Sequence, residues 1–80
     1  MTREEVAKKV IKIVAEVLNA DKETVELNSS FKEDLGADSL DSFEMVKEIE
    51  DAFDITIADE NVHELKTPSD VVDFVCKKLE

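Results

Sequence analysis

Apolar residues recur every three or four positions between residues 3 and 18, which is the spacing of one face of an α-helix. Thr2 and Glu5 precede this run in the order of a capping box, a pattern that marks a helix start. The sequence therefore predicts a first helix over residues 3–18. Its apolar face comprises Val6, Val10, Ile13, Val14 and Val17, with Ile11 and Leu18 beside them.

Between residues 19 and 38 the helical period is lost, and Asn, Asp, Ser and Gly become frequent. A loop of about twenty residues is long for a compact domain, so it needs anchors on the core. A short turn is expected at residues 21–25. The side chains expected to pin the loop to the core are Val25, Leu27, Phe31 and Leu35.

A second helix is predicted over residues 39–53. Asp38 is suited to its N-cap, and Asp41 places negative charge in the first turn, near the positive end of the helix dipole. Gly36 is the only glycine of the chain and allows a sharp turn just before this helix. The expected apolar face comprises Leu40, Phe43, Val46, Ile49 and Phe53, with Met45 and Ala52 beside them.

The remaining residues predict a short helix and a longer last one. Residues 55–57, ITI, are typical of a strand but have no partner strand, so they are interpreted as a buried connection. Asp59 is expected to cap a short helix that ends near Leu65, and Thr67-Pro68 starts the last helix. The inward side chains of that helix are expected to be Val71, Val72, Phe74, Val75 and Leu79, with Cys76 as a buried thiol. The sum is an all-α fold, a small four-helix bundle of three main helices and one short helix.

Composition narrows the possible partners. Eighty residues fit a single domain over residues 1–80. Ten Lys and Arg against 21 Asp and Glu give a net charge of -11, which repels nucleic acid and suits a basic protein partner. No apolar run is long enough to span a membrane, and the N-terminus lacks the pattern of a signal peptide. We therefore expect a cytoplasmic protein, unless a targeting segment precedes this sequence and is removed. The single cysteine and the absence of a calcium-loop pattern predict no metal site.

Ser39 lies between two aspartates in the stretch GADSLD, residues 36–41. A serine at a helix start is often only a cap, but Asp38 already takes that position. A hydrolase nucleophile is not supported, because the GxSxG pattern is absent and the only histidine, His63, lies in another segment where we expect it to be exposed. A modified serine fits better, since a phosphate ester at a helix N-terminus meets free N–H groups and the positive end of the dipole.

GADSLD followed by an acidic amphipathic helix resembles the acyl carrier protein family, and the order of helices and loop is similar along the whole chain. The resemblance implies a carrier that is not an enzyme. Ser39 would bear a covalent 4'-phosphopantetheine, attached by a phosphopantetheinyl transferase, whose thiol holds acyl chains as thioesters.

The acidity and apparent independence of the chain favour type II fatty acid synthesis, in which a monomeric carrier visits basic-surfaced enzymes. Two alternatives remain open: a carrier for a polyketide, peptide or specialised lipid pathway, or a small acidic helical adaptor without a prosthetic group.

The resemblance also assigns two further sets of residues. Partner recognition is expected to involve the acidic second helix and the start of the third, at Asp38, Leu40, Asp41, Glu44, Glu48, Glu50, Asp51, Asp59 and Glu60. Most acidic runs are only solvated surface, but this one flanks Ser39, which favours docking. An acyl chain would fold between the helices against residues that otherwise form the core: Phe31, Val46, Ile49, Ile57, Val62, Leu65 and Val71.

The net charge of -11 predicts that salt stabilises this protein, because like charges crowd a small core. Raising the NaCl concentration from about 0.01 M to about 1 M shortens the Debye length from about 30 Å to about 3 Å, which screens the repulsion. We expect the melting temperature, followed by circular dichroism, to rise across this series. An unchanged melting temperature would show that self-repulsion does not limit the stability.

Overall fold

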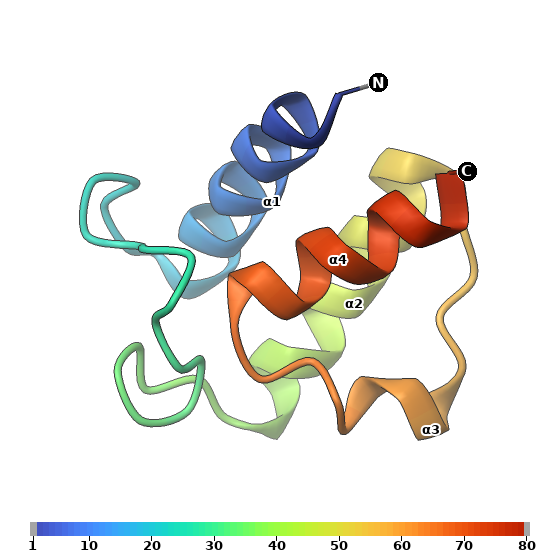
Figure 1. Cartoon of the computed structure of the whole chain (residues 1–80). Coiled ribbons are helices and arrows are strands. Elements are labelled where there is room, and N and C mark those ends of the chain that lie inside the picture. The colour runs from blue at the N-terminus through green and yellow to red at the C-terminus, as the bar shows by residue number, and fades with distance from the viewer. Residues whose placement is uncertain (1, 80) are drawn as a thin grey trace.

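The computed structural model describes residues 2–79 and contains four helices. These are α1 (Arg3–Leu18), α2 (Ser39–Phe53), α3 (Asp59–Val62) and α4 (Pro68–Leu79), and residues 2–79 include no strand. Both α2 and α4 pack against α1, and the long segment between α1 and α2 loops out on one side (Figure 1). The all-α prediction is therefore confirmed.

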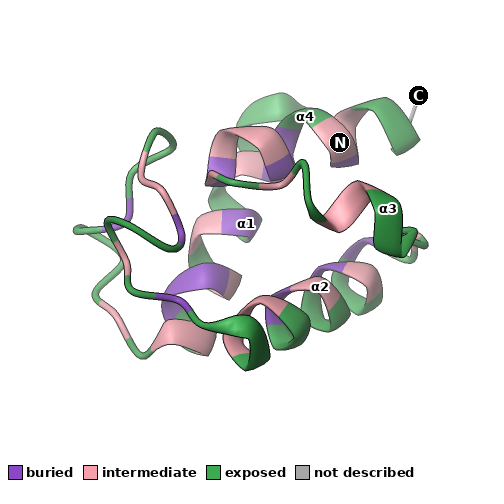
Figure 2. Ribbon diagram, turned by 90° about the horizontal axis from the view of Figure 1, so that it is seen from below, coloured by how far each residue is buried: buried purple, intermediate pink, exposed green. Residues whose placement is uncertain are grey.

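The core forms around the valine stripe of α1. Val6, Val10 and Val14 have 0% exposure and stand one turn apart on one side of the helix. Each fully buried side chain of this size contributes about 1.5–3 kcal/mol of transfer free energy. Figure 2 shows the buried positions turned toward the middle of the molecule. The other helices supply the most deeply buried partners of this stripe, which are Ile49, Val71, Val72 and Val75.

Two predicted helix starts are confirmed in atomic detail. The Glu5 N–H donates to Thr2 Oγ1 at 3.2 Å, and the Asp70 N–H donates to Thr67 Oγ1 at 3.2 Å. In the second case the Asp70 carboxylate accepts the Thr67 N–H in return, at 3.2 Å. The short helix α3 is present as predicted, but its predicted cap was wrong, because Asp59 is the first helical residue and no side chain caps the helix.

The ends of α1 and α2 are set by short polar residues in the left-handed conformation. Asn19 has φ 53° after α1, and Asp54 has φ 54° after α2. Asn and Asp adopt this conformation more readily than other residues with a Cβ atom. Beyond Asn19, the Thr24 N–H donates to the Asp21 carbonyl at 3.0 Å, which confirms the turn predicted at residues 21–25.

The long loop is held on the core by three of its four predicted anchors, Val25, Phe31 and the partly buried Leu35, and by backbone hydrogen bonds. Val25 and Phe31 are buried, as predicted. The Phe31 N–H donates to the Lys66 carbonyl at 3.0 Å, and the Ser69 N–H donates to the Leu27 carbonyl at 3.0 Å. Leu27 itself is 41% exposed, so it is not the core anchor that the sequence predicted.

The apolar face predicted for α2 was wrong at its start. Leu40 and Phe43 are 74% and 62% exposed, whereas Met45, Ile49 and Phe53 form the buried face. Leu40 and Ile49 lie nine residues apart, which is about two and a half helical turns and places them on opposite sides. An α-helix has 3.6 residues per turn, so each step of three residues falls about 60° short of a full turn. Apolar residues spaced repeatedly by three therefore move from one face of the helix to another.

Smaller corrections concern the edges of the core. Ala52 is exposed and Leu79 is 44% exposed, while Phe74 and Cys76 are only half-buried. Ile57 is buried in an irregular segment, which confirms the buried connection before α3. The short helix ends at Val62, three residues before the predicted end, and its remaining residues form a turn.

Gly36 has φ 68°, and a Cβ atom there would meet no atom within 4 Å. The glycine is thus required by its left-handed conformation and not by lack of space. We expect Gly36→Ala to lower the free energy of unfolding by about 1–2 kcal/mol, the cost of this conformation for an L-residue. Gly36→Asn should cost less, because Asn tolerates it.

Urea denaturation of the three proteins measures this difference. Equal stability of Gly36→Ala and the parent protein would show that the segment adopts another conformation at no cost.

Candidate functional site at the start of α2

Ser39 is the first residue of α2 and is exposed. Its position is fixed by one capping box, which Asp38 before it and Asp41 after it form together. The Asp41 N–H donates to Asp38 Oδ1 at 2.9 Å, and the Asp38 N–H donates to Asp41 Oδ2 at 3.2 Å. The sequence predicted Asp38 as the cap but not the reciprocal bond from Asp41. The two aspartates beside Ser39 therefore have a structural role as well as a charge.

The segment that leads into α2 is anchored just before the capping box. Ala37 is buried, and its N–H donates to the Phe31 carbonyl at 2.7 Å. Gly36 turns the chain immediately upstream. These contacts hold the first turn of α2 in one place, so the Ser39 hydroxyl is presented from a rigid support.

The free backbone donors at this helix start suit a phosphate ester on Ser39. The Ser42 N–H donates to the Asp38 carbonyl at 3.0 Å, and the Asp41 N–H is taken by the Asp38 carboxylate. Among residues 2–79, no acceptor lies in hydrogen-bonding range of the other two N–H groups of the first turn, those of Ser39 and Leu40. Free N–H groups and the positive end of the dipole favour an anion at this position.

Comparison with known proteins agrees with this geometry. The family described as "Phosphopantetheine attachment site" matches residues 8–75. An acyl carrier protein of an Exiguobacterium species is 48% identical over 79 residues, which cover 99% of this chain and 100% of that protein. The acyl carrier protein of Thermosynechococcus vestitus is 46% identical over 79 residues, 99% of this chain and 98% of its own length. That of Exiguobacterium sibiricum is 44% identical over 75 residues, 94% of this chain and 95% of its own.

The chain belongs to the acyl carrier protein family, whose members bear a phosphopantetheine group. Proteins of this family carry acyl groups and are not enzymes, as the sequence predicted. Acyl chains are therefore what the members of this family bind.

The acidic residues of α2 form a stripe on one flank of the helix. Asp41, Glu44, Glu48 and Asp51 are spaced by three or four residues, which places them on one side. Glu44, Glu48 and Asp51 are exposed, and Asp41 is half-buried by the capping box. Figure 2 shows the outward side of α2 as mainly exposed. Asp59 and Glu60, on α3, are also exposed.

Glu50 stands apart from this stripe. It lies two residues after Glu48, which is about 160° around the helix. Its carboxylate accepts the Ile57 N–H at 2.8 Å, in a partly buried position. The resemblance assigned Glu50 to partner recognition. In the structure its carboxylate instead binds within the chain, where it links the connection before α3 to α2.

The sequence analysis placed Phe43 in the core. In the structure it is exposed, which makes it a further candidate docking residue. Phe43 and Leu40 are the exposed large apolar side chains of α2. Lys47 lies over the Phe43 ring, with its Nζ 5.5 Å from the ring centre. The exposure of Phe43 could have been predicted from its angle around the helix axis. It is six residues from Ile49, which places it about 120° from the buried face.

The seven residues predicted to line an acyl pocket gather in the core. Phe31, Ile49, Ile57 and Val71 are buried, and the others pack against them half-buried: Val46, Val62 and Leu65. None of the seven lines either of two surface hollows that lie beside α1. In this form of the molecule these side chains pack against one another as core.

Two further features bear on the sequence predictions. No helix within residues 2–79 is long and apolar enough to cross a membrane. In the same part of the chain no three His, Cys, Asp or Glu side chains come together as a metal site would require. His63 is exposed just after α3, as the sequence predicted.

The Glu50 contact predicts a stability difference between two substitutions. Glu50→Ala leaves the partly buried Ile57 N–H without its acceptor, and we expect a loss of about 1–2 kcal/mol in unfolding free energy. Glu50→Gln retains an amide oxygen and should lose less. Glu48→Ala, an exposed change on the same helix, should stay within about 0.5 kcal/mol of the parent protein.

Urea unfolding of the three variants checks this expectation. Equal losses for Glu50→Ala and Glu48→Ala would show that the hydrogen bond to Ile57 contributes nothing.

Proposed function

We propose that this protein carries growing acyl chains in type II fatty acid synthesis, on a 4'-phosphopantetheine arm attached to Ser39. The observation that carries the proposal is the exposed Ser39 hydroxyl at the capped start of α2, inside the region that matches the family. The acidic flank of α2 beside it supports a free-standing carrier that meets basic enzyme surfaces.

The residues around Ser39 fit the group. A phosphodiester on Ser39 Oγ would lie beside the N–H groups of Ser39 and Leu40, which have no partner among residues 2–79. Asp38 and Asp41 each accept the other's backbone N–H, and neither carboxylate is hydrogen-bonded to these two donors. When bound, the arm supplies a thiol that holds acyl groups as thioesters.

Docking would use the stripe of Asp41, Glu44, Glu48 and Asp51 together with the exposed Leu40. A basic partner would be steered by the charges and anchored by the apolar side chain next to the attachment site. Such contacts are small and sensitive to salt, which suits a carrier that must leave each enzyme. We propose that the carrier works as a monomer in the cytoplasm.

An acyl chain would enter the core between α2 and α3. The lining would be the seven core residues named above, and α3 is the wall most easily displaced. None of the residues of α3 is buried, and its N-cap, Ala58, makes no side-chain hydrogen bond. The tie between Glu50 and Ile57 would then hold the connection in place while α3 moves.

The attachment site predicts the outcome of a modification experiment. Unmodified protein is incubated with coenzyme A and a broad-specificity phosphopantetheinyl transferase, and intact mass is recorded. We expect a gain of one phosphopantetheine on the parent protein and none on Ser39→Ala. Ser42→Ala is the matched control, because it removes a hydroxyl from the same helical turn, and it should be modified like the parent protein.

If the folded parent protein gained no mass, the proposal would be contradicted. The alternative of an acidic helical adaptor without a prosthetic group would then be favoured. Modification of Ser39→Ala would place the arm elsewhere. The pathway is tested next, by supplying the modified protein to purified fatty acid synthesis enzymes and following chain extension by mass. Modification without extension would favour a carrier of another pathway.

A further inference from the structure

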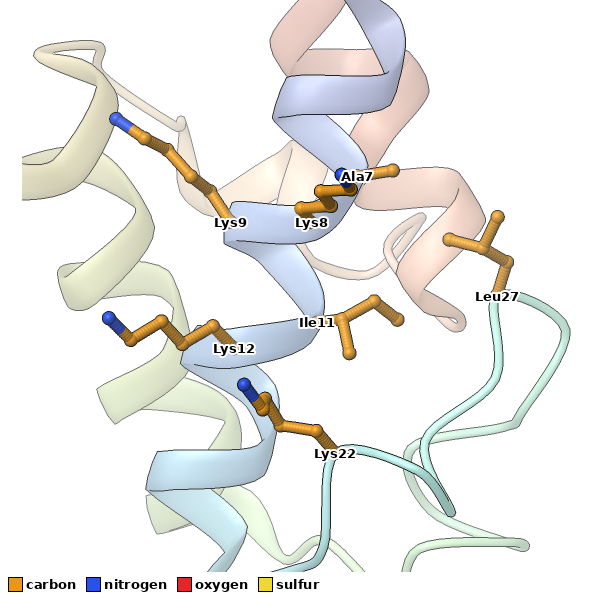
Figure 3. A pocket seen from close by; sticks show the side chains of 7 residues that line it. All are labelled: Ala7, Lys8, Lys9, Ile11, Lys12, Lys22 and Leu27. Atoms are coloured by element: carbon orange, nitrogen blue, oxygen red, sulfur yellow. The ribbon is translucent and has the colours of Figure 1, made fainter.

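A basic hollow of about 440 Å³ lies between the outer side of α1 and the long loop, and it shares no residue with the site at α2 and α3. Its apolar floor consists of Ala7, Ile11 and Leu27. Figure 3 shows Ile11 on α1 pointing toward Leu27 on the loop, with Lys9, Lys12 and Lys22 on the side of Ile11 that faces away from Leu27. The basic side chains are Lys8, Lys9, Lys12 and Lys22.

The concentration of positive charge is unusual for this chain. Four of its ten basic residues line one hollow, although the net charge is -11, and no acidic residue lines it. Lys8 lies 3.9 Å from the Glu4 carboxylate, and Lys9 lies over the Phe53 ring. Within residues 2–79, Lys12 and Lys22 have no carboxylate in salt-bridge range. These two lysines are thus available to an anionic partner.

The far wall of the hollow is held in place before any partner arrives. The Leu27 carbonyl accepts the Ser69 N–H at 3.0 Å, which ties the loop to the first turn of α4. Lys22 belongs to the turn closed by Thr24 and Asp21. Leu27 nevertheless leaves 41% of its surface exposed. A preformed apolar contact of this kind costs little ordering entropy on binding.

The openness of the hollow indicates which class of partner it can bind. It is open and shallow, whereas sites for small molecules enclose most of the ligand surface. An open apolar floor bordered by lysines on one side matches a single apolar side chain that projects from an acidic segment of a protein.

We propose that this basic hollow is a second docking surface, which binds an acidic segment of a partner protein through one aliphatic or aromatic side chain. The side chain would contact Ile11 and Leu27, and the carboxylates beside it would pair with Lys12 and Lys22. The proposal does not depend on modification of Ser39.

The net negative charge of the chain does not prevent this contact. At physiological ionic strength the Debye length is about 8 Å, so charges on the far side of the molecule are screened. The molecule measures 31 × 26 × 19 Å, while the lysines stand at the rim of the hollow itself. Local charge therefore decides the binding of a short segment.

The experiment uses the full chain labelled with ¹⁵N and a synthetic helical peptide in which one leucine is flanked by glutamates. We expect amide shifts centred on Ile11, Lys12, Lys22 and Leu27 as the peptide is added. The double variant Lys12→Glu/Lys22→Glu should bind about tenfold more weakly, since two exposed ion pairs are replaced by repulsion. Replacing the peptide leucine by serine should abolish the response.

The matched control is Lys77→Glu/Lys78→Glu, which changes the net charge by the same amount at the end of α4. It should bind the peptide like the parent protein. Equal weakening in both double variants, shifts centred on α2, or no response would overturn the proposal. A response to dodecanoate with none to the peptide would also overturn it, because the hollow would then take a small anionic amphiphile.

Discussion

The burial of the valine stripe of α1 is the interaction on which the other elements depend. Val6, Val10 and Val14 are fully enclosed, and α1 is the helix against which both α2 and α4 pack. A core of this size has no second apolar layer to compensate for a loss at its centre. Because α1 contacts both α2 and α4, it fixes where each of these two helices lies.

This arrangement explains why α2 can serve as a surface. Its buried face is narrow, with Met45, Ile49 and Phe53 turned to the core, so the opposite flank of the helix is exposed. The acidic stripe lies along one flank, and Leu40 and Phe43 project from the outer side. Exposed apolar side chains lower the solubility of a monomer, and their position next to Ser39 is consistent with the partner contact proposed above.

Charge is distributed unevenly over the molecule. Acidic residues follow α2 and the start of α3, whereas four lysines gather beside α1 and the loop. Two such regions, on different elements, allow partners of opposite charge to be distinguished without a change of fold. The loop contributes to both, because it supplies Leu27 and Lys22 to one region and positions Ser39 in the other through the bond between Ala37 and Phe31.

The sequence alone determined the features that depend on neighbouring residues. The four helices, their caps at Thr2, Asp38 and Thr67, and the position of Ser39 follow from local hydrogen bonding and helical period, which act over a few residues. The sequence also identified the buried valines of α1 and α4, but only the tertiary structure decided which apolar side chains of α2 are buried. Leu40 and Phe43 match the composition of a core face, but α1 contacts the other side of α2. Likewise, Glu50 lies among acids in the sequence, and the fold brings its carboxylate to the Ile57 N–H. Burial and long-range pairing depend on where other elements lie, and a linear pattern does not contain that information.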